Sequence, residues 1–321
     1  MQPRPAALDR LLSRSKPVAY RGDGLEAALA RWFGLEECPQ DTLPVAPLTY
    51  RLDTGESASG YLLRADPVHL RADQSSLRLF DADTFTITQG EIDQLVASFN
   101  AFYAGRDLQL QAPCPRRCYL SCPSAPGITT TALSQVAGQD INAFLPQGSE
   151  AADWHRLLNE VQMLFHDHPV NVAREQHGEP AINSLWFWGG GVSPERLQCQ
   201  AIRIASDHPL VKGLALQAKL PLLDVPAEAR GLLAADTEGI TLVIDDALAS
   251  AARYGEFESW VKGVLDLEKA WFAPLLELLR RGVLGSLEID PCNGTRFLID
   301  WRQRYRFWRP DRPFERFCPH E

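Results

Sequence analysis

Three consecutive glycines followed by Ser-Pro-Glu form the segment of the sequence with the clearest potential for chemistry. In NSLWFWGGGVSPE, residues 183–195, Gly189, Gly190 and Gly191 follow an apolar run with two tryptophans. Glycine lets backbone amides approach a ligand, and Ser193 with the proline after it suits the first turn of a helix. A strand, loop and helix start of this kind attracts anions. Close strand-to-helix packing is the open alternative, because the phosphate-loop lysine and the GxGxxG spacing are absent.

A group of histidines lies shortly before the glycines. His166, Asp167, His168 and His177 fall within one segment, and His166 and His168 could hold a metal ion from a strand or loop. The sequence instead predicts a helix end here, because Pro169 follows, and a positive side chain is favourable at a helix C-terminus without any ligand. We favour helix capping over metal binding. The sequence contains no HExxH or GxSxG motif.

Three of the seven cysteines, Cys114, Cys118 and Cys122, are evenly spaced. Zinc and iron-sulfur sites usually use two-residue gaps, whereas both gaps here are three residues long. Residues four apart on a strand share one face, so the spacing favours small buried side chains over a metal site. We expect metal-free thiols on or beside a strand, and reduced cysteines throughout.

The C-terminal residues 296–321 interleave seven arginines with aromatic residues, a composition that can stack bases or bind phosphates. The whole chain of 321 residues, however, carries a net charge of −9. We therefore favour arginines paired with acidic surface, and expect no nucleic-acid or membrane partner, since both need a basic surface. The absence of a long apolar stretch or a secretory signal predicts a cytoplasmic protein.

The pattern of apolar residues predicts a mixed α/β protein. Helices are expected over 22–35, after the capping box of Thr88 and Glu91, after a cap at Ser149, and over 256–281. Strand-like runs at 46–52, 59–65, 68–70, 75–80, 108–110 and 117–121 indicate a small sheet. Runs at 185–188, 220–225, 241–244 and 286–289 lack polar alternation, which is typical of a parallel sheet covered on both faces.

The run HPVNVAREQHGEPAINSLWFWGGG, residues 168–191, resembles archaeal-type cofactor-independent phosphoglycerate mutases, in which Ala-Asn and an aliphatic residue precede Trp-x-Trp-Gly-x-Gly. GDGLEAALARWFGL and PRRCYLSC are similar to further segments of that family, and ADPVHLRAD with LWFWGGG also resembles bacterial regulatory proteins of the Rpf type. The resemblance implies an alkaline-phosphatase-like, mostly parallel sheet flanked by helices, with an inserted α/β cap. It implies an N-terminal remnant at 1–47, the cap at 48–180 and the phosphatase-like domain at 181–321.

The chemistry of the resembling family needs a hydroxyl nucleophile and two divalent metals. By that resemblance, the nucleophile's Ser-Asp falls at Leu8 and Asp9, and the family's first strand, ending in Asp-Gly, has no counterpart. The strand that carries metal-binding histidines becomes VIDDALASAARYG, with Asp245 and Asp246, and the late Asp-His pair becomes Asp290-Pro291. Too few ligands are expected for two metals, so no metal or cofactor is predicted.

The resemblance and its missing ligands lead to two alternative functional hypotheses. The first is a cytoplasmic, non-catalytic regulatory or ligand-binding protein that binds a small anionic ligand or a protein partner. Its candidate anion pocket comprises Arg174, Asn183, Gly189, Gly190, Gly191 and Ser193. The alternative is a metal-dependent mutase or phosphatase with a rebuilt active site, which would draw on Asp245, Asp246, Asp290, Arg174 and His166 or His168.

Overall fold

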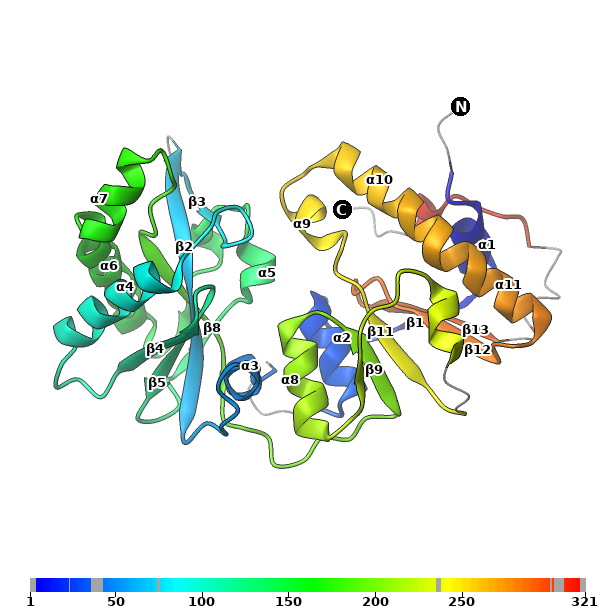
Figure 1. Ribbon diagram of the computed structural model, residues 1–321, viewed down its shortest axis with the longest axis horizontal. Coiled ribbons are helices and arrows are strands. Elements are labelled where there is room, and N and C mark those ends of the chain that lie inside the picture. The colour runs from blue at the N-terminus through cyan, green and yellow to red at the C-terminus, as the bar shows by residue number, and fades with distance from the viewer. Residues whose placement is uncertain are drawn as a thin grey trace. The chain divides into compact units, whose positions relative to one another are not determined.

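The computed structural model describes residues 4–22, 24–35, 43–73, 76–234, 238–300, 302 and 309–317. It is a mixed α/β protein of two compact units (Figure 1). Unit 1 comprises Met1–Glu36, Gln198–His208 and Leu220–Glu321, and unit 2 comprises Glu37–Leu197 and Pro209–Lys219. The domain bounds expected from the family resemblance stay a prediction. No helix of the described residues is long and apolar enough to span a membrane.

Unit 2 is built on an antiparallel sheet whose long central strand is β2 (Tyr61–Asp73). It pairs with β3 (Ser76–Phe80), β5 (Arg117–Cys122) and β8 (Ser184–Gly191), and β4 (Gln109–Cys114) pairs with β5. The parallel pairing predicted for 185–188 is wrong, because β8 runs antiparallel to β2. Every residue of β8 is buried, so the strand lacks polar alternation without being parallel.

Helices α4 (Gln89–Phe102), α6 (Ala151–His166) and α7 (Pro169–Gln176) supply the main core of unit 2 against one face of this sheet (Figure 1). The capping box predicted at the start of α4 is confirmed, since Thr88 and Glu91 bond each other's backbone N–H. The cap predicted at Ser149 is wrong, because its hydroxyl donates to the carbonyl of Gly127. The short elements here are α5 (Leu133–Val136), β6 (Ile128–Thr129), β7 (Gln147–Gly148) and a 3-10 turn at Ile141–Ala143.

Helices α3 (Val45–Thr54) and α8 (Pro209–Ala218) pack together in unit 2, where α3 also contacts β2 and β8. The strand predicted over 46–52 is wrong, because these residues form α3. Pro47 lies in the first turn, where no N–H is needed, and Gly55 ends the helix with φ +78° and an N–H bond to the carbonyl of Arg51. Tertiary burial of this apolar helix overrides the weak strand pattern.

Unit 1 contains two three-stranded sheets. Strand β9 (Arg203–Ser206) pairs in parallel with β10 (Leu222–Leu223) and β11 (Thr241–Ile244), so parallel pairing is confirmed there. Strand β13 (Thr295–Asp300) pairs antiparallel with β1 (Lys16–Ala19) and β12 (Ser286–Ile289). The parallel pairing predicted for 286–289 is wrong, because β12 pairs antiparallel with β13. The connection between the two strands is short, which an antiparallel hairpin allows, whereas a parallel pair needs a long crossover. The sheets of the described chain are therefore mostly antiparallel.

Helix α1 (Ala6–Arg14) packs near the antiparallel sheet of unit 1, burying leucines against Phe297 and Ile299. The long helix predicted over 256–281 is confirmed as α10 (Phe257–Leu267), a π-helical turn (Glu268–Phe272) and α11 (Ala273–Arg281). The Glu268 carboxylate accepts the N–H groups of Ala7 and Leu8 at 2.6 and 3.1 Å, which satisfies free donors at the start of α1. The remaining elements are α2 (Gly24–Trp32), α9 (Ala249–Arg253) and 3-10 turns at Ala229–Ala234 and Phe314–Phe317.

Candidate functional site

The three glycines of the predicted anion loop lie inside β8 rather than after it. Residues 192–202 contain no helix, so the predicted strand-loop-helix arrangement is wrong, and Ser193 lies half-buried in an irregular segment. A Cβ atom on Gly190 would lie 2.5 Å from the hydroxyl of Tyr61, and one on Gly191 would lie 2.5 Å from the Cβ of Pro44. Such distances are too short for real side chains, so close packing of β8 accounts for these glycines.

Arg174 and Asn183, the side chains of the predicted anion pocket, make hydrogen bonds within unit 2. The buried guanidinium of Arg174 pairs with Glu91 at 2.7 Å, and donates to two backbone carbonyls at 2.7 and 2.9 Å. The amide of Asn183 donates to the Leu70 carbonyl at 2.8 Å and accepts the Leu70 N–H at 2.7 Å. These contacts tie α7 to the start of α4 and residue 183 to β2. Anion binding by this set stays a prediction.

The helix end predicted in this segment is confirmed, because α6 ends at His166. Capping of that C-terminus by a positive His168 is wrong, because the His168 side chain caps the start of α7 instead. Its Nδ1 accepts the N–H of Val170 at 3.2 Å, and its Nε2 lies 2.9 Å from the hydroxyl oxygen of Ser98. A neutral imidazole that accepts at Nδ1 carries its proton on Nε2, which therefore donates to Ser98. Burial lowers the pKa of His168 and favours this neutral form. The pair lacks the free nitrogen that would activate a serine nucleophile.

Three thiols of unit 2 lie on strands, as the cysteine spacing predicted. Cys114 ends β4, while Cys118 and Cys122 lie in β5. Burial raises the pKa of Cys118, and burial followed by the nearby charge of Glu150 raises the pKa of Cys122 to about 12. Such thiols are protonated at neutral pH and behave as small apolar side chains. Their freedom from metal stays a prediction.

Asp290, which the family resemblance aligns with a metal-binding aspartate, is held by other groups of unit 1. Its Oδ1 accepts the Tyr20 hydroxyl at 3.0 Å and the Cys292 N–H at 2.8 Å. Its Oδ2 lies 3.3 Å from the guanidinium of Arg31, which also pairs with Glu288 at 2.6 Å. Burial, followed by the charge of Asp290, raises the pKa of Tyr20, so its hydroxyl stays a donor.

The other positions of the implied two-metal centre are also used locally. Asp245 is exposed and accepts the N–H of Ala247 at 2.9 Å. Leu8 packs against Phe297, and Asp9 accepts the N–H of Phe314 at 2.8 Å. Within the described ranges, no three His, Cys, Asp or Glu side chains are arranged to hold a metal ion. The described residues at these positions therefore do not fit a two-metal centre.

Part of the arginine-rich C-terminal segment lies outside the described residues, at 301, 303–308 and 318–321. In the described part, Arg296 pairs with Glu288 at 3.2 Å, and Arg309 donates to the carbonyl of Ser15 at 3.2 Å. These contacts are of the kind expected for arginines docked on the protein's own surface. Nucleic-acid binding by this segment is untested.

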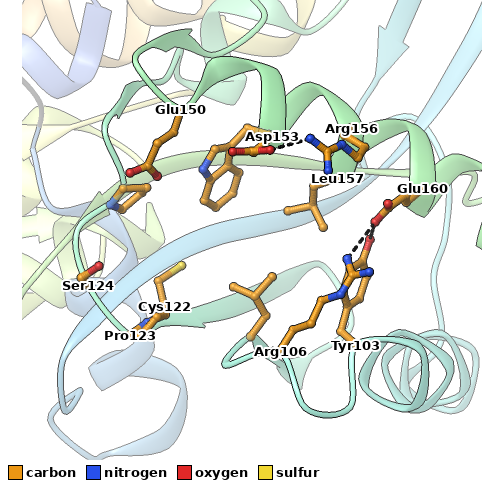
Figure 2. A pocket seen from close by; sticks show the side chains of 13 residues that line it. Tyr103, Arg106, Cys122, Pro123, Ser124, Glu150, Asp153, Arg156, Leu157 and Glu160 are labelled. Atoms are coloured by element: carbon orange, nitrogen blue, oxygen red, sulfur yellow. Dashed lines mark hydrogen bonds and ion pairs between the residues drawn. The ribbon is translucent and has the colours of Figure 1, made fainter.

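Unit 2 contains a cavity of about 290 Å³ that the sequence patterns did not indicate (Figure 2). Its lining comes from the end of α4, the end of β5, the loop after it and one side of α6. The lining residues are Tyr103, Arg106, Leu108, Cys122, Pro123, Ser124, Pro126, Glu150, Asp153, Trp154, Arg156, Leu157 and Glu160. None of these segments carries a sequence motif that signals the cavity.

No family model matches the chain. Among curated proteins it is similar to 2,3-bisphosphoglycerate-independent phosphoglycerate mutases. That of Methanosarcina mazei is 24% identical over 309 residues, which cover 84% of this chain and 78% of the relative. A probable mutase of Geobacter sulfurreducens is 23% identical over 294 residues, covering 83% and 71%. The resemblance to cofactor-independent mutases is thus confirmed in sequence, whereas the Rpf-type assignment stays a prediction.

Two solved structures are also similar to this chain. A cofactor-independent phosphoglycerate mutase from Thermoplasma acidophilum has a TM-score of 0.41 and 15% identity, and covers 92% of this chain and 84% of its own. The PH0037 protein from Pyrococcus horikoshii has a TM-score of 0.43 and 17% identity, with coverages of 83% and 72%.

Proposed function

We propose that this chain is a non-catalytic regulatory or ligand-binding protein on a phosphoglycerate-mutase-like scaffold. In this proposal unit 2 contains the inserted cap, unit 1 contains remnants of the alkaline-phosphatase-like domain, and the regulatory relatives are those of the Rpf type. Sequence similarity to curated mutases supports the scaffold.

The observation that carries the proposal is the engagement of Asp290 with Arg31. A metal ligand needs a carboxylate oxygen free to face the ion, but both oxygens of Asp290 already accept hydrogen bonds or an ion pair. The guanidinium is largely buried and would repel a divalent cation at the same carboxylate. In this proposal, Arg31 neutralises the charge of Asp290, as a bound metal ion would otherwise do.

Leu8 and Asp9 support the same conclusion from the implied nucleophile position. Leu8 has no hydroxyl, and its side chain packs in an apolar cluster with Leu12 and Phe297. Asp9 is buried, and its carboxylate already accepts the N–H of Phe314 at 2.8 Å. Phosphoryl transfer by the family's mechanism requires both the hydroxyl and the metals.

The alternative function, a metal-dependent mutase or phosphatase with a rebuilt site, is favoured by the names of the curated relatives. It would have to recruit Asp245, Asp246 or Asp290 after breaking their present contacts. We also propose that the non-catalytic protein binds a small anion or a protein partner.

The test is an activity assay of the full chain with manganese, magnesium, zinc or cobalt, on phosphoglycerates and on p-nitrophenyl phosphate. We expect no turnover above the uncatalysed rate, while a curated mutase assayed in parallel converts phosphoglycerate. Turnover that disappears in Asp290→Asn or Asp245→Asn, with folding retained, would overturn the proposal and establish the enzyme.

A further inference from the structure

The outer face of the β2–β3 ribbon in unit 2 carries two arginines directly opposite each other. The two strands lie side by side in Figure 1, and Arg71 of β2 pairs with Arg78 of β3 in the antiparallel register. Both arginines are exposed, whereas Leu70 and Leu79, which alternate with them and point to the other face, are buried. Cβ atoms of directly opposite residues lie about 5 Å apart, so the ladder brings two positive side chains together.

Nearby carboxylates do not pair with these two arginines. Among the described residues, neither guanidinium makes an ion pair or a hydrogen bond. Asp140 bridges to the backbone of Arg78, but hydrogen bonds from backbone N–H groups, first that of Leu77 at 3.2 Å, lower its pKa more than the charge of Arg78 does. Asp73 lies on the same face, one pleat beyond Arg71, and makes no ion pair with either arginine. Solvent and salt therefore screen the two charges, and no carboxylate lies between them.

Arg71 is held in place by its neighbours on the ribbon. Its guanidinium carbon lies 4.6 Å from the centroid of the Phe80 ring, so the side chain reaches across to β3, the strand of Arg78. The Phe80 ring in turn lies 6.2 Å from the ring of His69, whose Nδ1 is hydrogen bonded to the carbonyl of Ala181 at 2.8 Å. A positioned guanidinium loses less conformational freedom when it binds a ligand.

This arrangement favours an oxyanion with two negative charges. Like charges directly opposite on a sheet destabilise it, and screening by salt weakens that repulsion without reversing it. A bound dianion reverses it, because each guanidinium can donate two parallel N–H bonds to oxygens of the anion. A phosphoryl group presents three oxygens and can accept from both guanidinium groups, whereas the two oxygens of a carboxylate match one guanidinium.

We propose that Arg71 and Arg78 together bind a phosphoryl dianion, as free phosphate or as a phosphate monoester. The inference rests on the proposed function, since it gives a chemical class and a place to the small anion of that proposal. The place differs from the predicted pocket around Arg174, whose guanidinium is buried and paired with Glu91.

The first test is a calorimetric or NMR titration of the full chain with inorganic phosphate, phenyl phosphate and benzoate, at slightly alkaline pH and in the presence of EDTA. We expect both phosphates to bind at millimolar concentration, and benzoate, with one charge and two oxygens, to bind about tenfold more weakly. Equal affinity for the two phosphates identifies free phosphate as sufficient, whereas tighter binding of phenyl phosphate identifies an ester; both results support the site.

Variants assign the binding to the two arginines. Arg71→Gln and Arg78→Gln should each weaken phosphate binding about tenfold, because each removes charge-assisted hydrogen bonds. Arg78→Lys keeps the charge without the planar fork and should lie between Arg78→Gln and the parent chain. Arg156→Gln is the matched control, because this exposed arginine of unit 2 is paired with Asp153 and should leave the affinity unchanged.

Thermal unfolding in low-salt buffer tests the repulsion itself. Arg78→Gln should raise the Tm by about 1–3 °C, because it removes a like-charge contact without touching Phe80. Phosphate should raise the Tm of the parent chain and leave that of Arg78→Gln unchanged.

Three results would overturn the proposal. They are the absence of saturable binding at millimolar phosphate, an affinity unchanged in both glutamine variants, and a Tm that falls in Arg78→Gln at low salt. None of them bears on turnover, since EDTA removes divalent metals here, and metal-dependent turnover in the earlier assay would overturn the proposed function alone.

Discussion

Arg64 and Asp66 form a buried ion pair within a single strand, β2. Their side chains lie on the same face because they are two residues apart, with 2.6 Å between Nη2 and Oδ1. Trp188 of β8 donates its indole N–H to the other oxygen of Asp66 at 2.7 Å, and Arg64 lies over the rings of Trp188 and Tyr119. Burial raises the pKa of Asp66, while Arg64 and Trp188 favour its carboxylate. A slip of β2 by one residue would turn this pair to the opposite face, so it fixes the strand register.

We predict that Arg64→Met destabilises the protein by about 3–5 kcal/mol, because it leaves the carboxylate of Asp66 buried without its partner. Urea unfolding followed by circular dichroism measures this loss. Arg156→Ala is the matched control in the same unit, because it breaks an exposed pair with Asp153 and should cost less than about 1 kcal/mol. Equal losses of unfolding free energy in the two variants would show that burial adds nothing to the stability contributed by the Arg64–Asp66 pair.

Gly190 should be intolerant of even the smallest side chain. A Cβ there would lie 2.5 Å from Tyr61 and 2.7 Å from Leu63, so we predict that Gly190→Ala costs about 1–3 kcal/mol through overpacking. At Gly90, in α4, a Cβ would meet nothing within 4 Å, and Gly90→Ala should be neutral or slightly stabilising. Thermal unfolding of both variants checks this, and a harmless Gly190→Ala would refute the packing explanation of the glycine run.

Asp53 should make the protein acid-sensitive. Burial opposes its ionisation, but hydrogen bonds from Arg117 at 2.6 and 2.8 Å and from Tyr119 outweigh burial and lower its pKa. The unfolded chain therefore takes up a proton at higher pH than the folded chain. The stabilisation is complete above the unfolded pKa of about 3.9 and is lost as the pH falls through the lower folded pKa.

The measurement is the free energy of unfolding between neutral and acidic pH, for the parent chain and for Asp53→Asn. The parent should lose stability in acid more steeply than the variant, and the variant should be the less stable of the two at neutral pH. A variant with the same pH slope as the parent would contradict the assigned role of Asp53.

His168 should act as a helix cap rather than as a catalytic base. Asparagine can replace its acceptor for the N–H of Val170, so His168→Asn should be near neutral, whereas His168→Ala should cost about 1 kcal/mol. Chemical unfolding of the two variants separates them. If both lose the same stability, the hydrogen bond from Val170 contributes nothing measurable.

Local signals in the sequence were reliable where one short-range interaction decides the structure. The capping box of Thr88 and Glu91 predicted the start of α4, and helical spacing predicted the apolar side of α6. Residues 46–52 were predicted as a strand and form a helix, because Gly55 and the packing of α8 decide their conformation. Strand direction could not be predicted from the buried run of β8, since burial on both faces removes polar alternation in either direction.

The structures of the candidate sites depend on contacts between residues far apart in the chain, which the sequence alone does not reveal. Arg174 was predicted to face an anion, but its partner Glu91 lies 83 positions away in the chain. The cavity of unit 2 combines residues from the segment after α4, from β5 and the loop after it, and from α6, and no single segment carries a recognisable motif. The predicted departures from the resembling family's motifs, at Leu8 and near Asp245, rest on residue identities alone and need no tertiary pairing.

The most direct test of the central claim is a manganese titration of the full chain, purified without chelator, followed by the electron paramagnetic resonance signal of the free ion. Asp290→Asn is titrated alongside. We predict that the parent chain leaves the free-ion signal undiminished at micromolar metal, as Asp290→Asn does, because Arg31 already neutralises this carboxylate. Stoichiometric uptake of two manganese ions by the parent, abolished in Asp290→Asn, would contradict the account.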